Sequence, residues 1–190
     1  MAKNPHDFRY LQSDQRIRTA IFFLLKKHST SIKIKDLCKK AKIKNPTFYN
    51  HFKNTDQIIE STETMILSQF QNLYTKLQFQ KPAPSDLFYH LLIFVYKNRI
   101  YFSTASEKQD FSLMFKILSI IHPAITKNWL KFDPIINEQI FIIYSGAITS
   151  AIYFWCRKTN FDLEKLPLYI NLLIKITNTF KTQGSNLAIK

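Results

Sequence analysis

Polar, hydrogen-bonding side chains gather on one short segment, between Asn45 and His51, where they could contact nucleic-acid bases. Helical spacing places Phe48 and Phe52 on one face of this segment and leaves its polar residues facing outward. The major groove of DNA admits an α-helix, and side chains near the start of that helix reach base edges. We expect Tyr49 to meet a phosphate or a thymine methyl group. Base contacts are expected from Asn45, Thr47, Asn50 and His51.

Lysines flank this segment on both sides and could hold the phosphate backbone of DNA. Such contacts dominate affinity and make it dependent on salt. An alternative interpretation is that Tyr49 and His51 pack within the domain and that the lysines form a solvated face. The polar set lies on one short helix opposite an apolar pair, which favours DNA binding. The lysines expected to contact phosphates are Lys33, Lys35, Lys42, Lys44 and Lys53.

The composition predicts a folded, all-α, basic protein. The chain has 190 residues, of which 46% are hydrophobic and only two are glycine. Its formal net charge is +14, and residues 1–60 contribute 13 Lys/Arg and 5 Asp/Glu, a net +8. A basic balance of this size favours a polyanionic partner, and the first third is where we expect nucleic acid to bind. Some lysine-rich proteomes make every surface basic, which is a partial alternative explanation.

Several function classes find no support in the sequence. Cys38 and Cys156 lie far apart, so neither a disulfide framework nor a metal site is indicated. No glycine-rich phosphate loop, paired acids or nucleophile motif suggests an enzyme or a cofactor. The N-terminus lacks the apolar region of a signal peptide, and a reducing cytoplasm is expected. Residues 140–156 are apolar but shorter than the ~20 residues of a membrane span, so we expect a buried interface helix.

The helical pattern divides the chain into a domain at 1–56 and a second domain at 57–190. Ser13 or Asp14 can cap a first helix, and helices at about 34–41 and from Asn45 complete the first domain. A long helix that opens at about Asn54 and ends at the proline-containing segment 81–84 then connects the two domains. Further helices are expected at about 85–102, 107–121, 135–158 and 167–180, with Pro123 opening a short one. This is about nine helices in all.

Residues 34–59, and more loosely 15–70, resemble the DNA-binding domain of TetR/AcrR-type transcriptional regulators. That family has an Asp-aliphatic pair in its second helix and the pattern Thr-(Leu/Phe)-Tyr-x-His-Phe in its third. Asp36-Leu37 and Thr47-Phe48-Tyr49-Asn50-His51-Phe52 match these motifs. The resemblance implies a homodimer on a near-palindromic operator, with the third helix of each subunit in the major groove. It also implies a C-terminal domain that binds a small effector.

The resemblance places DNA contacts by position and also shows where this chain departs from the family. The positions are Lys33, Lys44, Asn45, Pro46, Thr47, Tyr49, Asn50 and His51, and Thr55 stands where a phosphate-contacting Lys is common. Lys33 replaces a capping Thr, Lys42 replaces a turn Gly, and Lys44 replaces a Ser. The additional lysines could make the phosphate contact that Thr55 cannot make. The operator sequence cannot be inferred from that of a related regulator.

The second domain offers a candidate dimer interface and a candidate effector pocket. Tyr144-Ser145-Gly146-Ala147 with Trp155 resembles the dimerising eighth helix of many such regulators, so a four-helix interface is implied. For each residue of this candidate interface, a place in the intramolecular core is an equal alternative. The candidate interface residues are Ile140, Ile143, Ala147, Ala151, Leu172, Leu173, Ile176 and Phe180. An apolar or aromatic effector would contact aromatic residues of the middle helices, although aromatic residues at helical spacing usually form core. These are Phe70, Tyr74, Phe94, Phe111, Phe115, Trp129 and Phe141.

The hypothesis from the sequence is a one-component repressor that a small molecule releases from DNA. Effector binding would tilt the long connecting helix and change the spacing of the two recognition helices. One alternative is a DNA-binding regulator without a small-molecule effector, controlled by a protein partner or constitutive. Another is a protein that uses its basic domain on anionic lipid, in which case Tyr49 would be dispensable.

Overall fold

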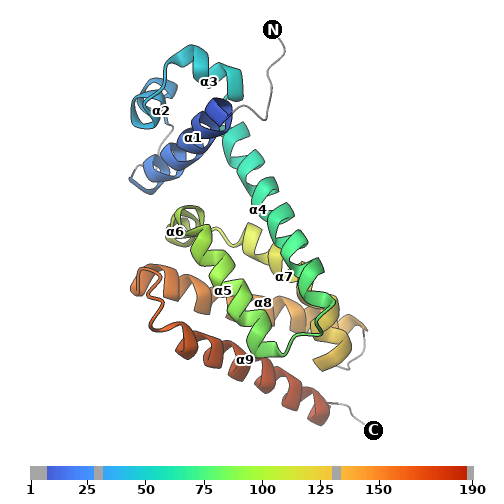
Figure 1. Cartoon of the computed structure of the whole chain (residues 1–190). Coiled ribbons are helices and arrows are strands. Elements are labelled where there is room, and N and C mark those ends of the chain that lie inside the picture. Colours follow the sequence, from blue (N-terminus) through green and yellow to red (C-terminus); the bar gives the residue numbers. More distant parts are fainter. Residues whose placement is uncertain (1–7, 28–31, 130–133, 188–190) are drawn as a thin grey trace. The chain divides into compact units, whose positions relative to one another are not determined.

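The computed structural model describes residues 8–27, 32–129 and 134–187, with side chains described in 8–27, 32–123 and 138–179. These segments form nine helices and no strand, as the sequence predicted (Figure 1). The chain divides into two compact units, Met1–Ile66 and Leu67–Lys190, which we call the head and the body. The division lies within the long helix α4 (Thr55–Gln78), whereas the sequence analysis placed it at residue 56.

The head contains α1 (Phe8–Lys27), α2 (Ile34–Ala41), α3 (Asn45–His51) and the first part of α4. Its core is made by apolar residues that recur at helical spacing on each helix, which is why these short helices are stable only together. The fully buried members of that core are Ile17, Ile21, Leu37, Phe48 and Ile58.

The turn between α2 and α3 depends on a lysine in an unusual conformation. Lys42 adopts the left-handed region, with φ 55° and ψ 48°, and its backbone N–H caps the end of α2. The backbone N–H of Ile43 also donates to the Cys38 carbonyl at 3.0 Å. A side chain with a Cβ is disfavoured at this φ, and glycine is the usual residue at such a helix end. The position therefore stores strain that packing in the head must offset.

The body consists of the rest of α4 together with α5 (Pro84–Lys97), α6 (Arg99–Lys108), α7 (Ser112–Trp129), α8 (Pro134–Lys158) and α9 (Leu166–Leu187). Helix α8 packs against α6, α7 and α9, and α5 packs against α9 (Figure 1). The indole N–H of Trp155 donates to the Asp162 carbonyl at 3.0 Å, which fixes the turn from α8 into α9. The body core includes Phe88, Phe102, Tyr144 and Trp155.

Four predicted helix boundaries are wrong. The helix expected from about 107 begins at Ser112, because α6 continues to Lys108. Helix α1 begins at Phe8, so Ser13 lies inside it, where its hydroxyl donates to the Arg9 and Tyr10 carbonyls instead of capping. The expected helix at 85–102 is two helices, because α5 ends at Lys97 and α6 begins at Arg99. Pro123 lies within α7 and does not begin a separate helix.

Candidate nucleic-acid interface

The inner face of α3 is the anchor of the candidate interface. Phe48 is fully buried and Phe52 is 5% exposed, and their rings lie 6.4 Å apart. Pro46 occupies the first turn of α3, where a missing N–H costs no helical hydrogen bond. Asn45 is the first residue of α3 and does not cap it, since Lys44 is the N-cap residue and makes no side-chain cap hydrogen bond. Packing of the phenylalanines therefore holds this seven-residue helix on the head.

The outer face of α3 carries most of the residues predicted to contact bases. Tyr49 is 58% exposed, and its ring meets Phe48 edge-on at 5.2 Å, which limits the directions it can take. Asn45, Pro46 and Asn50 are also exposed, and Thr47 is half-buried. The structure thus brings together an amide, a phenol and a second amide on one solvent-facing surface of a short helix.

His51 does not face outward, so the expectation that it lies with the base-contacting set is wrong. Its side chain is 2% exposed and its Nε2 lies 2.7 Å from the Ser13 hydroxyl oxygen of α1. The imidazole also lies against the Tyr10 ring at 3.9 Å, and its Nδ1 is 3.8 Å from an Asp14 carboxylate oxygen. His51 is the last residue of the seven-residue helix α3. Its side chain points toward α1 and connects α3 to α1.

Arg18 joins three helices of the head and was not singled out from the sequence. Its guanidinium donates to Asp14 at 2.6 Å, and to the hydroxyls of Ser61 and Thr62 at 2.9 and 2.7 Å. It also lies over the Phe52 ring, 5.1 Å from the centroid. Charged hydrogen bonds of this kind are the stronger ones in proteins. Arg18 therefore fixes α1 to the first turns of α4 and to the end of α3.

The predicted phosphate-contacting residues lie around α3 on the same unit. Lys33 is the N-cap residue of α2, and Lys35 follows in its first turn; both side chains are exposed. Lys44 and Lys53 are exposed at the two ends of α3. Thr55, the first residue of α4, is half-buried. Every one of these positions belongs to the head.

The start of α4 beside α3 is set by a reciprocal pair of hydrogen bonds. The backbone N–H of Gln57 donates to the Asn54 side-chain oxygen at 2.9 Å, and the Gln57 side-chain oxygen accepts from the Lys53 backbone N–H at 2.7 Å. This arrangement is close to a capping box, in which two backbone N–H groups at a helix start are satisfied reciprocally. It fixes where the chain leaves α3. Cys38, on the buried face of α2, is a core residue, and burial raises the pKa of its thiol.

The residues predicted to line an effector pocket differ in burial and in their aromatic neighbours. Phe70 and Phe94 are buried and meet edge-on at 5.1 Å. Phe111 is 37% exposed and stacks on Tyr153 at 5.3 Å, while Phe141 stacks on His122 at 3.9 Å. Tyr74 is buried and Phe115 half-buried, and the Trp129 side chain lies outside the described residues.

Among the described residues of the body, three buried hydroxyls make no hydrogen bond within the chain. They belong to Tyr74 in α4 and to Ser145 and Thr149 in α8. The two α8 residues are fully buried and one helical turn apart. Leaving a buried polar group unpaired costs about 1–3 kcal/mol. Of the three, only Tyr74 was predicted as a pocket residue, although Ser145 and Thr149 are recognisable as polar residues at i, i+4 in an apolar helix.

The candidate dimer surface is only partly exposed. Ile143 is 61% and Leu172 40% exposed, and Ile140, Ala147, Ala151 and Ile176 are half-buried. Leu173 is fully buried within the body, in agreement with the alternative that it belongs to the intramolecular core, and the Phe180 side chain lies outside the described residues. Phe154 and Leu168, 56% and 64% exposed, were not predicted.

Helix α8 is also long and apolar enough to cross a membrane, over Glu138–Lys158 with mean hydropathy 1.4. Core helices of folded domains pass the same test, and here 44% of the apolar window is buried against other helices. The buried residues include Tyr144, Ile148, Ile152 and Trp155. The length of α8 is thus accounted for by packing within the body.

Comparison with known proteins identifies the fold. No protein-family model matches the chain, and neither does any curated protein sequence. The structure of a TetR transcriptional regulator from Streptococcus agalactiae 2603V superposes with a TM-score of 0.58 over 88% of this chain and 96% of that one, at 14% identity. This chain has the TetR-type fold. Dihydroxyacetone kinase operon activator DhaS shares this fold, with a TM-score of 0.55, 17% identity, and coverage of 89% and 98% of the two chains.

The TetR-type fold accounts for the arrangement of the head and for the number of helices in the described parts of the chain. The structural match covers nearly the whole length of both neighbours. The likeness therefore includes the body as well as the helix-turn-helix. It confirms the resemblance that the Thr47–Phe52 motif indicated, at the level of the fold.

Proposed function

We propose that this protein is a transcriptional regulator that binds double-stranded DNA through α3. The observation that carries the proposal is the two-sided character of that helix. Phe48, Phe52 and His51 fix one side to the head, while Asn45, Tyr49 and Asn50 are exposed on the other. A rigid helix that presents amides and a phenol can discriminate bases in the major groove. The flanking lysines supply phosphate contacts.

The first experiment selects random double-stranded DNA with the purified protein at near-physiological salt and sequences the recovered pool. We expect an inverted repeat, because the proposed species is a homodimer that places one α3 in each half-site. A pool without a motif would overturn the proposal, because it would mean that the lysines bind only charge. If anionic vesicles bind and Tyr49→Ala leaves that binding unchanged, the lipid alternative is correct instead.

Variants of the head then separate effects on sequence preference from effects on the overall affinity for DNA. Tyr49→Ala or Asn50→Ala should reduce preference for the selected site by about 1–3 kcal/mol, or roughly 10- to 100-fold, since each removes a base-directed group. Lys44→Ala should weaken binding to all sequences by a similar factor. Lys116→Ala, at an exposed position of α7 in the body, is the matched control and should change neither quantity.

The homodimer is proposed to form through α8 and α9. Apolar side chains remain exposed on both helices, and a Cβ added at Gly146 would meet nothing within 4 Å in the same chain. A glycine without neighbours leaves space for close approach of a second helix. Ile143→Asp should shift the protein to monomer in sedimentation. Ile100→Asp, at a 44% exposed isoleucine of α6, is the control and should leave the dimer intact.

We further propose that the body binds a small effector that controls DNA binding. The unpaired hydroxyls of Tyr74, Ser145 and Thr149 support this, because a polar group on a ligand could supply the missing hydrogen bonds. Such a ligand releases DNA only if it binds the free dimer more tightly than the DNA-bound dimer. Equal affinities would exclude that mechanism and favour a regulator without an effector.

Thr149→Val tests the role of the hydroxyls directly. If a ligand pairs with this group, the substitution weakens ligand binding. If nothing pairs with it, the substitution stabilises the protein, because an unmade buried hydrogen bond is removed. Release by ligand would make the protein a repressor. The neighbour named as an operon activator indicates that the fold also serves activation, so a reporter placed behind the selected operator decides the sign.

A further inference from the structure

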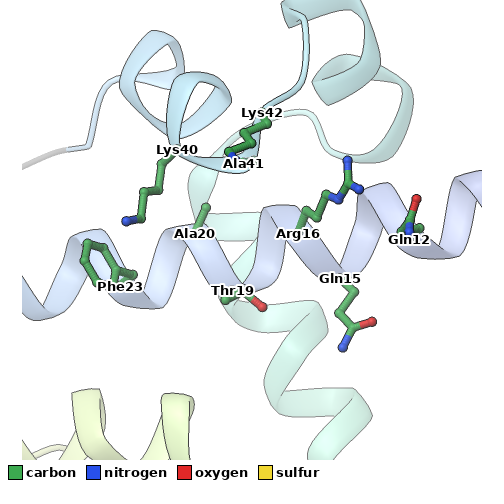
Figure 2. A pocket seen from close by; sticks show the side chains of 9 residues that line it. All are labelled: Gln12, Gln15, Arg16, Thr19, Ala20, Phe23, Lys40, Ala41 and Lys42. Carbon is green, nitrogen blue, oxygen red and sulfur yellow. The ribbon is translucent and has the colours of Figure 1, made fainter.

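A groove on the head, between α1 and the C-terminal end of α2, is not part of the surface formed by α3. It has a volume of about 630 Å³. One stripe of α1 forms its floor, at the helical spacing of Gln12, Arg16, Thr19 and Phe23 (Figure 2). The end of α2 forms its wall. The remaining lining residues are Gln15, Ala20, Lys40, Ala41 and Lys42.

The lining formed by the described residues is basic and contains no acidic residue. Arg16, Lys40 and Lys42 carry the charge, and all three side chains are exposed. Two glutamines and Thr19 add neutral hydrogen-bond donors. Arginine and lysine side chains donate hydrogen bonds and accept none, so a groove with this lining favours an anionic occupant.

Phe23 orients one of these charges. The Lys40 ammonium lies 3.4 Å from the centroid of the Phe23 ring, and the Lys27 ammonium lies 4.9 Å from it. Figure 2 shows the Lys40 side chain directed over the ring. A cation–π contact holds an ammonium without neutralising it, since the ring has no net charge. The contact therefore restricts Lys40 before any ligand binds, while the 38% exposed ring offers an apolar surface beside it.

The groove ends at the turn that leads into α3. Lys42, one of its lining residues, is the residue in the left-handed conformation between α2 and α3. A polyanion in contact with α3 thus lies next to the groove on the same unit. This proximity favours a continuous phosphate chain over a small free anion.

We propose that the groove binds the sugar–phosphate backbone of DNA outside the base pairs that α3 contacts. Arg16, Lys40 and Lys42 pair with phosphates, and Phe23 packs against a deoxyribose. The head then contacts DNA over a longer stretch than the helix-turn-helix alone. This inference rests on the proposed function, because it requires that the head bind DNA.

The test measures affinity for the selected operator as a function of salt. Each phosphate contact contributes about 0.9 to the slope of log K against log salt. We expect Arg16→Gln and Lys40→Gln each to reduce that slope by about 1 and to weaken binding roughly tenfold near 50 mM salt. Site preference should not change, because phosphates carry no sequence information. Glutamine retains the length of the side chain and removes only its charge.

Lys39→Gln is the matched control, since Lys39 is an exposed lysine of α2 next to Lys40 and lies outside the groove lining. It should alter the slope less than Lys40→Gln does. Extending the operator duplex by half a helical turn at each end should strengthen binding by the wild-type protein. The same extension should leave binding by the Arg16→Gln/Lys40→Gln double variant unchanged.

The outcomes separate this inference from the proposed function. If no operator is selected, the proposed function fails and the groove proposal fails with it. If an operator is bound specifically and both groove variants behave as Lys39→Gln does, only the groove proposal is overturned. Stabilisation by millimolar inorganic phosphate that the double variant abolishes, with an unchanged operator slope, would also overturn it. That result would assign the groove to a small anion.

Discussion

The head and the body of this chain differ in the charge of their surfaces and in the polar contacts that join their helices. In the head, a charged side chain supplements the apolar core, because Arg18 joins helices through Asp14, Ser61 and Thr62. Its solvent-facing surface is basic. In the body, neutral hydrogen bonds such as that of Tyr144 with Thr177 supplement the buried aromatic and aliphatic residues, and apolar side chains such as Ile143 and Leu168 remain exposed.

This difference shows where sequence can indicate function. A polar residue at a regular spacing in a basic segment has few structural roles, so the head motif indicated a DNA-binding helix from its pattern alone. An aromatic residue at helical spacing in the body can be core, pocket or interface, and the pattern is the same in all three cases. The predictions below test whether the two units also differ in how they are stabilised.

The largest effect is expected from Phe48→Ala. Phe48 is fully buried under α3, and truncating a buried phenylalanine costs about 3–5 kcal/mol. We expect loss of protection from hydrogen exchange throughout the head and loss of DNA binding, with the helices of the body still protected. Hydrogen exchange followed by mass spectrometry resolves the two units. Loss of protection in α8 and α9 as well would mean that head and body fold as one unit.

The fold of the head could be predicted closely because local signals agree there. Helix α2 spans Ile34–Ala41 as predicted, and Pro46 begins α3 where its missing N–H costs nothing. The start of α1 was missed because Ser13, a good N-cap residue, instead bonds back to carbonyls within the helix and contacts His51. No local pattern reveals a partner 38 residues away.

Boundaries in the body were less predictable because tertiary packing overrides local preference there. Pro123 lies inside α7 despite a cost of about 3 kcal/mol for proline in a helix interior. Burial of Ile117, Leu118 and Ile121 in the preceding turns favours the helix against that cost. The burial of the Leu173 side chain could not be predicted either, because its neighbour Leu172 is also a leucine and yet is exposed to solvent.

The second prediction compares a polar joint of the head with one of the body. Arg18→Ala removes hydrogen bonds to Asp14, Ser61 and Thr62 and should lower the free energy of unfolding of the head by about 1.5–3 kcal/mol. Tyr144→Phe removes one neutral hydrogen bond to Thr177, at 2.9 Å, and should cost the body about 0.5–1.5 kcal/mol. Urea unfolding measures both, and equal costs would contradict the proposed difference between the joints.

The third prediction concerns two turns with the same backbone strain. Lys42 in the head and Gln109 in the body both end a helix at φ 55°. Replacing either with glycine should stabilise its unit by up to about 1 kcal/mol, because glycine adopts positive φ without a steric penalty. Lys42→Gly should also weaken DNA binding through loss of its charge, whereas Gln109→Gly should not. Thermal unfolding of both variants measures the effect of backbone strain on stability. Operator binding by both variants measures the effect of the lost Lys42 charge.

The smallest effect is expected from acid, and it should be confined to the body. Burial lowers the pKa of His122 in α7 below its ordinary value of 6.5, because desolvation penalises the imidazolium. The unfolded chain therefore binds a proton at a higher pH than the folded chain does. The stability that neutral His122 provides is complete above pH 6.5 and declines as the pH falls below that value.

His122→Gln tests the origin of this loss. The substitution should flatten the decline in protection of α7 and α8 between pH 7 and pH 5, the range in which an ordinary histidine titrates. The His122 ring stacks on Phe141 at 3.9 Å, so a charged ring would also lie against an aromatic face of α8. That contact is favourable for a cation and limits the size of the effect. A decline as steep in His122→Gln as in the wild type would assign the acid sensitivity to other groups.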